Sequence, residues 1–353
     1  MSSRLAALRK KLHGKEILTE MNEPTQWVTT GNFALNYRLS GRFDVGICNK
    51  RTFMLWGESG TGKTYLSSNL CKYIQDMGYM VIYLDSEGSI SENYMLKVGI
   101  DLSPDRFLPV MVDTIEEATL ALSEIFGNLS KDDKFVIVLD SLAGLLTEKE
   151  REEFSKGETK GEMGQIAKKL KLLVKNLNKK IQGYDAFCIL VTHAYQNQNP
   201  LNGEGLWICT GGKGFQFFPS FSINLNKLKI KQDDEGVSGV RIKAEVTKTR
   251  FAAPFQKCEL YVPYNKGINP YDGLLDILYK ELKIINKKGG WYSYSFEGED
   301  KKFQVSSFEE HIENLLVLLE NHQGEGVPKE DVKPWIDPEQ QEEEHPDSED
   351  GQN

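Results

Sequence analysis

The stretch T-F-M-L-W-G-E-S-G-T-G-K-T, residues 52–64, joins an apolar run to a glycine-rich loop that ends in Lys-Thr. Its second part, Gly57–Thr64, matches G-x-x-x-x-G-K-[ST], a pattern in which backbone N–H groups at a helix N-terminus surround a phosphate. The pattern assigns Lys63 to the β- and γ-phosphate oxygens and the Thr64 hydroxyl to Mg²⁺. We therefore expect a strand, a phosphate loop and a helix. The expected nucleotide-contacting residues are Gly57, Glu58, Ser59, Gly60, Thr61, Gly62, Lys63, Thr64 and Tyr65.

Three more short apolar runs follow, separated by helical patterns: M-V-I-Y-L-D (80–85), F-V-I-V-L-D (135–140) and F-C-I-L-V-T-H (187–193). Such runs are typical of strands buried on both faces of a parallel sheet, with helices packed against it. After Phe215 the strand-like segments follow one another directly, which indicates antiparallel hairpins that extend the sheet. A helix over 274–285, a hairpin, and a second helix beginning at the Ser307-x-x-Glu310 capping box predict a small C-terminal α/β lobe.

A phosphate loop also needs a carboxylate near its metal ion. Asp140 ends the apolar run 135–140, and ligands of such sheets bind beyond the carboxyl ends of the strands, so we expect Asp140 to coordinate the metal. Glu87 follows another strand and could orient or deprotonate a water that attacks the γ-phosphate. Asp85, two residues earlier, is the rival, and spacing alone does not choose between them.

Composition bounds the class of protein. The 353 residues are 39% hydrophobic and 27% charged, as in a soluble globular protein. The chain contains no apolar run of membrane-spanning length and no signal-peptide pattern, which favours a cytoplasmic location. Five scattered cysteines without C-x-x-C indicate reduced thiols rather than a zinc site. The net charge of −9 arises mainly from residues 337–353, an acidic tail that we expect to be disordered.

Two cations lie one residue apart in E-V-T-K-T-R-F-A-A-P-F, residues 245–255. If Lys248 and Arg250 both belong to a strand, they share one face of it, because side chains alternate. From this stretch alone, a charged sheet edge that discourages pairing is the favoured explanation. Two further segments, 147–164 and 194–214, are predicted to be long loops, and loops of that length in a compact domain are usually functional or disordered.

Seven motifs follow one another along the chain: G-E-S-G-T-G-K-T, Y-L-D-S-E-G, V-I-V-L-D-S-L-A-G-L, M-G-Q-I-A-K-K-L, T-G-G-K-G-F, K-T-R-F-A-A-P-F and G-I-N-P-Y-D-G-L-L-D. Their order resembles that of the RecA-type recombinases, and the C-terminal G-G-W-Y-S-Y also resembles the bacterial RecA pattern. The short N-terminal part, His193 after the fourth strand and the Lys248 and Arg250 pair look most like the bacteriophage UvsX branch. The resemblance implies an N-terminal helix or arm for subunit docking (1–30), a core (31–268), a lobe (269–336) and the tail (337–353). It spans roughly residues 25–322.

The resemblance also implies roles for single residues. Glu87 matches the catalytic glutamate, and Tyr94 matches the tyrosine that stacks on adenine. His193 stands where bacterial RecA has a glutamine that senses the γ-phosphate. Lys248 and Arg250 match a pair that reaches the γ-phosphate held by the next subunit.

The two long segments correspond to the family's DNA-binding loops. The residues implied to contact DNA are Met163, Gly164, Lys168, Lys175, Gly211, Gly212 and Lys213. Glycine N–H groups and lysines suit phosphate contacts. The first loop is unusually acidic for that role.

We therefore expect an ATP- and Mg²⁺-dependent recombinase that forms helical homo-oligomeric filaments on single-stranded DNA and pairs it with double-stranded DNA. A recombination mediator and a single-strand-binding protein are the expected partners, and a phage-encoded protein would act in the host cytoplasm. The alternatives are a ring-forming helicase of the same core fold, a phosphate-loop small-molecule kinase, and a paralogue that binds ATP without turnover.

Overall fold

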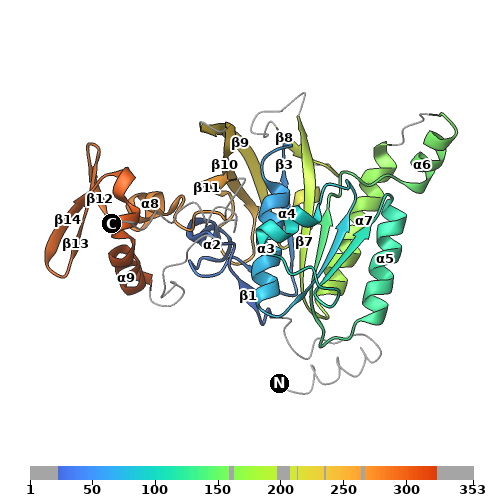
Figure 1. Cartoon of the computed structure of the whole chain (residues 1–353), viewed down its shortest axis with the longest axis horizontal. Helices are drawn as coiled ribbons and strands as arrows, with labels where there is room; N and C mark the ends of the chain where they lie inside the picture. The colour runs from blue at the N-terminus through green and yellow to red at the C-terminus, as the bar shows by residue number, and fades with distance from the viewer. Residues whose placement is uncertain are drawn as a thin grey trace, which may run out of the picture.

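The computed structural model describes residues 23–158, 163–196, 207–212, 214–233, 236–263 and 267–323. Most of the expected N-terminal arm, the acidic tail, Lys213 and most of the predicted second loop lie outside the described residues. In the described part, a large core occupies the centre and right of Figure 1, and a smaller lobe made by the C-terminal residues lies at the left.

Nine strands of the described chain form the central sheet, in the order β11-β10-β9-β3-β7-β6-β4-β5, with β8 paired to β7. Their bounds are β3 Thr52–Gly57, β4 Met80–Asp85, β5 Phe107–Met111, β6 Lys134–Asp140, β7 Asp185–Gln196, β8 Trp207–Cys209, β9 Phe221–Asp233, β10 Gly236–Lys248 and β11 Gln256–Pro263. The strands from β9 to β5 in this order run parallel, whereas β10 and β11 extend the sheet antiparallel. The predicted α/β fold class is confirmed.

The four apolar runs became β3, β4, β6 and β7, as predicted. The sequence prediction missed β5, which lies at the edge of the sheet and has Pro109 at its centre. An edge strand tolerates proline because one of its sides makes no ladder hydrogen bonds. Leu108 and Met111 of β5 are half or more exposed, so this strand lacks the continuous burial that revealed the others.

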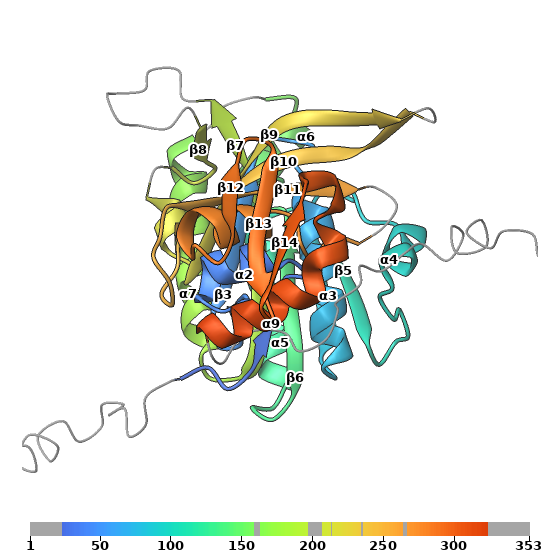
Figure 2. The same ribbon diagram turned by 90° about the vertical axis from the view of Figure 1, so that its left-hand side faces the viewer.

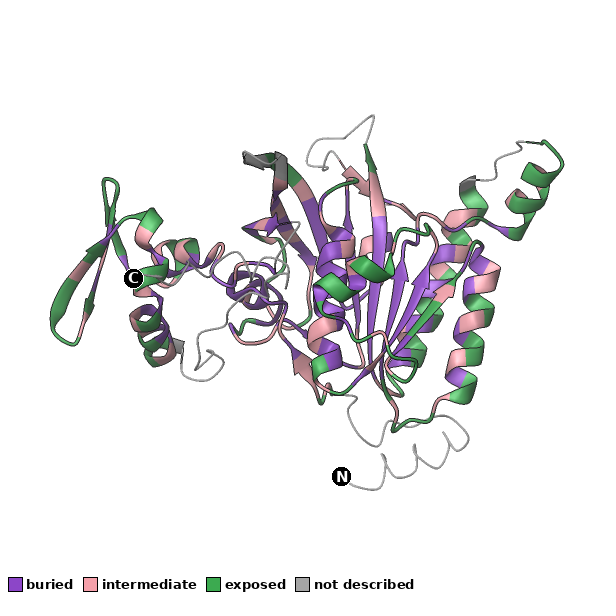
Figure 3. Ribbon diagram, in the orientation of Figure 1, coloured by how far each residue is buried: buried purple, intermediate pink, exposed green. Residues whose placement is uncertain are grey.

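Helices cover both faces of the sheet and create two hydrophobic cores. On one side lie α2 (Phe33–Ser40), α3 (Lys63–Asp76) and α4 (Glu92–Val98), and on the other lie α5 (Ile115–Asn128) and α7 (Met163–Ile181). Strand residues alternate between the cores: Phe53 and Leu55 pack into the first, Met54 and Trp56 into the second. Figure 3 shows the resulting purple sheet between helices whose outer faces are green.

The segment 147–164 is not a loop throughout, contrary to the prediction. Residues Glu148–Ser155 form helix α6, which begins at a capping box between Thr147 and Glu150. The segment 194–214 also differs, because β7 continues to Gln196 and pairs with the short strand β8. In the N-terminal part, β1 (Trp27–Val28) pairs with β2 (Ile47–Cys48).

The C-terminal lobe contains a three-stranded antiparallel sheet and a helix, which Figure 2 shows in front of the core. Its elements are α8 Leu274–Asp276, the π-helical turn η2 Ile277–Glu281, β12 Asn286–Lys288, β13 Trp291–Phe296, β14 Glu299–Phe303 and α9 Ile312–Gln323. The helix predicted over 274–285 ends at Glu281, because Lys283 has a left-handed φ of 57° that stops it. The predicted capping box at Ser307 was wrong, since 3₁₀ turns occupy Val305–Ser307 and Glu309–His311 before α9.

An ion pair joins the lobe to the core. Arg38 of α2, with only 8% of its side chain exposed, forms a bidentate pair with Glu281 and also donates to the carbonyl of Lys257 at 3.2 Å. Because the guanidinium is buried, its charge depends on this carboxylate for compensation.

We predict that Glu281→Ala lowers the free energy of unfolding by about 2 kcal/mol, because it leaves a buried charge without its partner. Urea unfolding measures the change. The matched control is Asp44→Ala, which removes the carboxylate of the more exposed Arg42–Asp44 pair and should cost no more than about 0.5 kcal/mol. Equal losses in the two variants would contradict a structural role for the buried pair.

Candidate nucleotide-binding site

Strands β3, β6 and β4 end near one another at one edge of the sheet, and β7, which lies between β3 and β6, continues beyond them to Gln196. Gly57 at the end of β3 pairs with His193 of β7, and Asp140 at the end of β6 pairs with Asp85 of β4. Since parallel strands point the same way, the phosphate loop, Asp140 and the segment after Asp85 all emerge at this carboxyl edge. Because the strands are neighbours in the order β3-β7-β6-β4, the side chains predicted to form the nucleotide site lie close together at this edge.

The phosphate loop is shaped by close backbone approaches. A Cβ atom on Gly57 would lie 2.2 Å from the carbonyl oxygen of Leu225, so only glycine fits beside β9. Gly62 has a left-handed φ of 79° and precedes α3, which begins at Lys63. The Lys63 ammonium donates to the carbonyls of Gly57 at 3.1 Å and Glu58 at 2.6 Å. The lysine is therefore held inside the loop.

Lys63 and Asp140 are charged groups with little access to water. Burial lowers the pKa of Lys63 to about 8, although the negative charges of Asp140 and Glu87 oppose the shift. Burial likewise raises the pKa of Asp140, against hydrogen bonds from Tyr83 and Thr64. The Tyr83 hydroxyl donates to Asp140 Oδ2 at 2.8 Å, and the Asp140–Ser141 peptide bond is cis.

The two carboxylates that the sequence left as rivals have different surroundings. Asp85 is buried, and its oxygens accept the backbone N–H groups of Glu87 and Gly88 at 3.0 Å each and of Ile90 at 3.3 Å. This carboxylate therefore fixes the loop that follows β4. It is committed to backbone amides, whereas the Glu87 side chain is about one-third exposed at the carboxyl edge.

Glu87 lies between two hydrogen-bonding side chains from neighbouring strand ends. Its Oε1 accepts a hydrogen bond from the Ser141 hydroxyl and lies 3.0 Å from His193 Nε2. Burial alone would raise the pKa of Glu87, but the hydrogen bonds from Ser141 and His193 outweigh it, and the positive charge of Lys63 adds to the net lowering. Residue spacing does not predict the Ser141 contact, because this contact depends on the pairing of β4 with β6.

Tyr94, the expected adenine-stacking residue, lies in the first half of α4. It is half-buried and packs against the core that contains Tyr65, and burial raises its pKa to about 12. Ser91 caps this helix, accepting the Tyr94 N–H at 3.2 Å. The position of Tyr94 therefore has a packing explanation of its own.

Lys248 and Arg250 lie at the opposite edge of the sheet. Lys248 ends the antiparallel strand β10 and pairs with Ser222, which in turn is level with Met54 at the third residue of β3. The strand stops there, so the expectation that both cations occupy one strand was wrong: Arg250 follows in an exposed bend. Burial lowers the pKa of Lys248, and the positive charge of Arg250 adds to the lowering. The Lys248 ammonium donates to the Phe217 carbonyl.

The residues expected to contact DNA fall on two elements. Met163 and Gly164 begin α7, and Lys168 and Lys175 lie exposed on one side of that helix, seven residues apart. Gly211 and Gly212 follow β8 with left-handed φ values of 98° and 94°. Lys213 lies outside the described residues.

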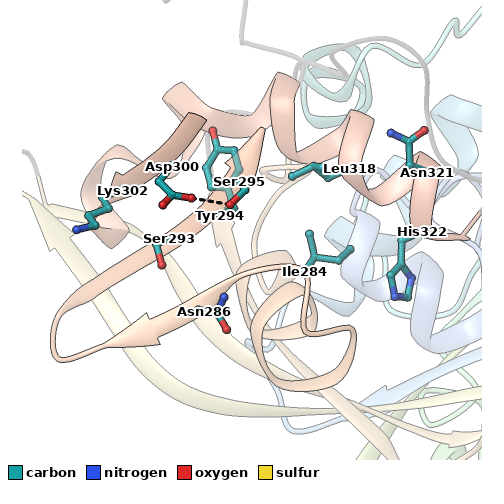
Figure 4. A pocket seen from close by; sticks show the side chains of 10 residues that line it. All are labelled: Ile284, Asn286, Ser293, Tyr294, Ser295, Asp300, Lys302, Leu318, Asn321 and His322. Carbon is teal, nitrogen blue, oxygen red and sulfur yellow. Dashed lines mark hydrogen bonds between the residues drawn. The ribbon is translucent and has the colours of Figure 1, made fainter. Parts of the chain in front are cut away.

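A separate pocket of about 640 Å³ lies in the C-terminal lobe (Figure 4). Its walls come from β12, β13, β14 and α9, and the Ser295 hydroxyl donates to Asp300 at 2.6 Å between the paired strands β13 and β14. No residue of the phosphate loop lines it. This pocket therefore belongs to the lobe and not to the carboxyl edge of the central sheet.

A parallel sheet with a phosphate loop at its carboxyl edge and a carboxylate on a nearby strand defines the class of α/β phosphate-loop nucleotide-binding proteins. The RecA N-terminal domain family matches residues 3–269. The chain belongs to this family. In the described residues, the longest apolar helical stretches are too short or too polar to cross a bilayer.

Similar proteins carry the same family name. Protein RecA of Rippkaea orientalis is 26% identical over 275 residues, covering 76% of this chain and 74% of the relative. Protein RecA of Chlorobaculum tepidum is 27% identical over 296 residues, covering 82% and 79%. Protein RecA of Crocosphaera subtropica is 26% identical over 273 residues, covering 76% and 73%.

We predict that Lys63→Met stabilises the nucleotide-free protein at pH 7, by about 2 kcal/mol, because it removes a buried ammonium. The folded pKa near 8 lies below the unfolded value, so the folded wild type gains stability as pH rises from about 8 to about 10. The advantage of the variant should therefore shrink over that range. Urea unfolding at each pH measures it, with Lys72→Met, which removes a partly exposed lysine of the same helix that pairs with Asp76, as the control for a lost lysine. A constant difference would contradict the burial cost.

Proposed function

We propose that the chain is an ATP-dependent DNA recombinase that assembles on single-stranded DNA and exchanges strands with a homologous duplex. The observation that carries the proposal is the placement of its charged groups at two edges of one sheet. The phosphate loop, Asp140 and Glu87 lie at the carboxyl edge, and Lys248 and Arg250 lie at the other. Family membership and the order of motifs support the same activity.

At the carboxyl edge, the side chains fit hydrolysis of a nucleoside triphosphate. Glu87 is the proposed general base, because its carboxylate is ionised, partly exposed and held by its neighbours, whereas Asp85 is bound to backbone amides. Lys63 would bind the phosphate oxygens, and His193 would sense the γ-phosphate through its contact with Glu87. Tyr94 would stack on the adenine.

The site also fits Mg²⁺. The Thr64 hydroxyl and the Asp140 carboxylate are oxygen donors, which this ion prefers, and Asp140 is buried where a cation would offset its charge. When bound, the ion would neutralise charge on the phosphate oxygens.

Lys248 and Arg250 are proposed to act on the nucleotide of an adjacent copy. Lys248 is level with Met54 of β3, which lies three residues before Gly57, a distance of about 10 Å along the strand. β10 is also separated from β3 by β9, so Lys248 lies a further distance of about 10 Å across the sheet. Its side chain is too short to reach the phosphate loop of its own chain. Two cations on one edge and a phosphate loop on the other suit head-to-tail contacts, which repeat into an open helix when they do not close.

Single-stranded and double-stranded DNA are the proposed ligands of the helix α7 and the glycine turn. Lys168, Lys175 and Lys213 would contact phosphates, with Met163, Gly164, Gly211 and Gly212 close to the strand. The acidic helix α6 is next to this surface, and its negative side chains would repel phosphates that approach it.

The functional subgroup we propose is the bacteriophage UvsX type, on the strength of His193 and of the Lys248 and Arg250 pair. A recombination mediator and a single-strand-binding protein would be its partners, in the host cytoplasm. The proposed division is an arm (1–30), a core (31–268), a lobe (269–336) and an acidic tail (337–353).

The function is tested by the ATPase rate with and without single-stranded DNA, alongside negative-stain imaging. We expect DNA to stimulate hydrolysis and filaments to form. Glu87→Gln should retain ATP and DNA binding but lose turnover about 100-fold or more, because it removes the base. Glu92→Gln, an exposed acid in the first turn of α4, is the matched control and should keep its rate. A wild type without DNA stimulation and without filaments would refute the proposal.

The shared site is tested by mixing two inactive variants, Lys63→Ala and the double variant Lys248→Ala/Arg250→Ala. In an equimolar random filament, one contact in four joins an intact phosphate loop to intact cations, so about a quarter of wild-type ATPase should return. Mixing Lys63→Ala with Glu87→Gln is the control, because both changes damage the same side of the contact. Absence of recovery at every ratio would place Lys248 and Arg250 outside the active site.

A further inference from the structure

Ser141 links the two loops that leave β4 and β6. It is completely buried, and its backbone is bound on both sides by Ser86: its N–H donates to Ser86 Oγ at 2.9 Å, and its carbonyl accepts the Ser86 hydroxyl at 2.6 Å. A Cβ atom on Gly144 would lie 2.5 Å from Ser86 Oγ and 3.1 Å from Glu87 Cγ, so the loops are in close contact. The position of the Ser141 side chain is therefore fixed.

The direction of the Ser141 hydroxyl is fixed as well. The Gly144 N–H donates to Ser141 Oγ at 3.2 Å, which occupies one acceptor site of that oxygen. A hydroxyl has a single proton to donate, and the Ser141 proton goes to Glu87 Oε1. His193 approaches the same oxygen at 3.0 Å. Within the described part of the chain, these contacts leave Oε2 as the oxygen that can take a proton from water.

We propose that Ser141 is a positioning residue for hydrolysis: its hydroxyl holds Oε1 of Glu87 so that Oε2 faces the attacking water. The inference rests on the proposed function, because it requires Glu87 to be the general base. In the step itself, the water oxygen bonds to the γ-phosphorus, the bond to the β,γ-bridging oxygen breaks, and the water proton passes to Glu87 Oε2. Ser141 gives up no proton and stays bound to Oε1.

A purely structural role for Ser141 makes different predictions. The backbone bonds to Ser86 survive Ser141→Ala, because they involve the N–H and carbonyl of residue 141. The substitution therefore removes the hydroxyl while the join between the loops persists. Ser86→Ala does the reverse, since it breaks both bonds to residue 141 and retains the hydroxyl against Glu87. The two variants separate positioning from loop stability.

The experiment measures kcat, KM for ATP and the thermal midpoint of the full chain with saturating single-stranded DNA. Ser141→Ala should lower kcat about tenfold with KM unchanged, since one hydrogen bond to the base is lost. Ser141→Cys, which keeps a side chain of similar size with a weak hydrogen-bond donor, should have a kcat between those of the wild type and Ser141→Ala. Ser86→Ala should lower the thermal midpoint more than Ser141→Ala does. It should lower kcat less than Ser141→Ala does. In a Glu87→Gln background, adding Ser141→Ala should leave the residual single-turnover rate unchanged, because the two residues act together.

Three outcomes would overturn the inference: an unchanged kcat in Ser141→Ala and Ser141→Cys, a raised KM at constant kcat, or a full additional loss in the Glu87→Gln background. These outcomes differ from failure of the proposed function. If the wild type hydrolyses ATP without any response to DNA, the recombinase proposal fails first. If the wild type responds and Glu87→Gln is inactive while Ser141→Ala is normal, only the role of Ser141 is lost.

Discussion

The register of four parallel strands is the constraint on which the rest of the structure depends. Gly57 beside His193, and Asp140 beside Asp85, bring the ends of β3, β7, β6 and β4 to one edge. Because side chains and loops emerge where parallel strands end, this register decides which groups come together at the candidate nucleotide-binding site. A slip of one residue in any pair would turn these side chains to the other face of the sheet. The same sheet sends the antiparallel β10 the other way, so Lys248 and Arg250 emerge at the far edge.

Burial at the carboxyl edge makes the site expensive to fold and chemically specific. The ammonium of Lys63 and the carboxylate of Asp140 are both removed from water, and burial is the largest influence on the pKa of each, partly offset by neighbouring charges or hydrogen bonds. Glu87 differs because hydrogen bonds at its carboxylate outweigh burial. Hydrolysis of a nucleoside triphosphate needs one group that offsets charge on the phosphate and another that accepts a proton from water. The buried ammonium of Lys63 and the separately ionised Glu87 suit these two tasks.

Much of the fold could be predicted from the sequence, and the exceptions have physical causes. Continuous apolar runs identify strands buried on both faces, so β3, β4, β6 and β7 were found, whereas the exposed edge strand β5 was missed. Local patterns failed where helix ends depend on a single backbone angle, as at Lys283, and where a charged segment forms helix α6. In the site, spacing identified the phosphate loop. The different surroundings of Asp85 and Glu87 come from how the loop after β4 folds back on Asp85, and the contact of Ser141 comes from the pairing of β4 with β6; spacing contains neither.

The central claim is that one active site is divided between two copies of the chain. The most direct measurement is an electron cryomicroscopy map of the protein assembled on single-stranded DNA with a non-hydrolysable ATP analogue. We expect an open helix in which Lys248 and Arg250 of one copy contact the terminal phosphate held by Gly57–Thr64 of the next. A closed ring, or an assembly in which both cations face solvent away from every nucleotide, would contradict the account.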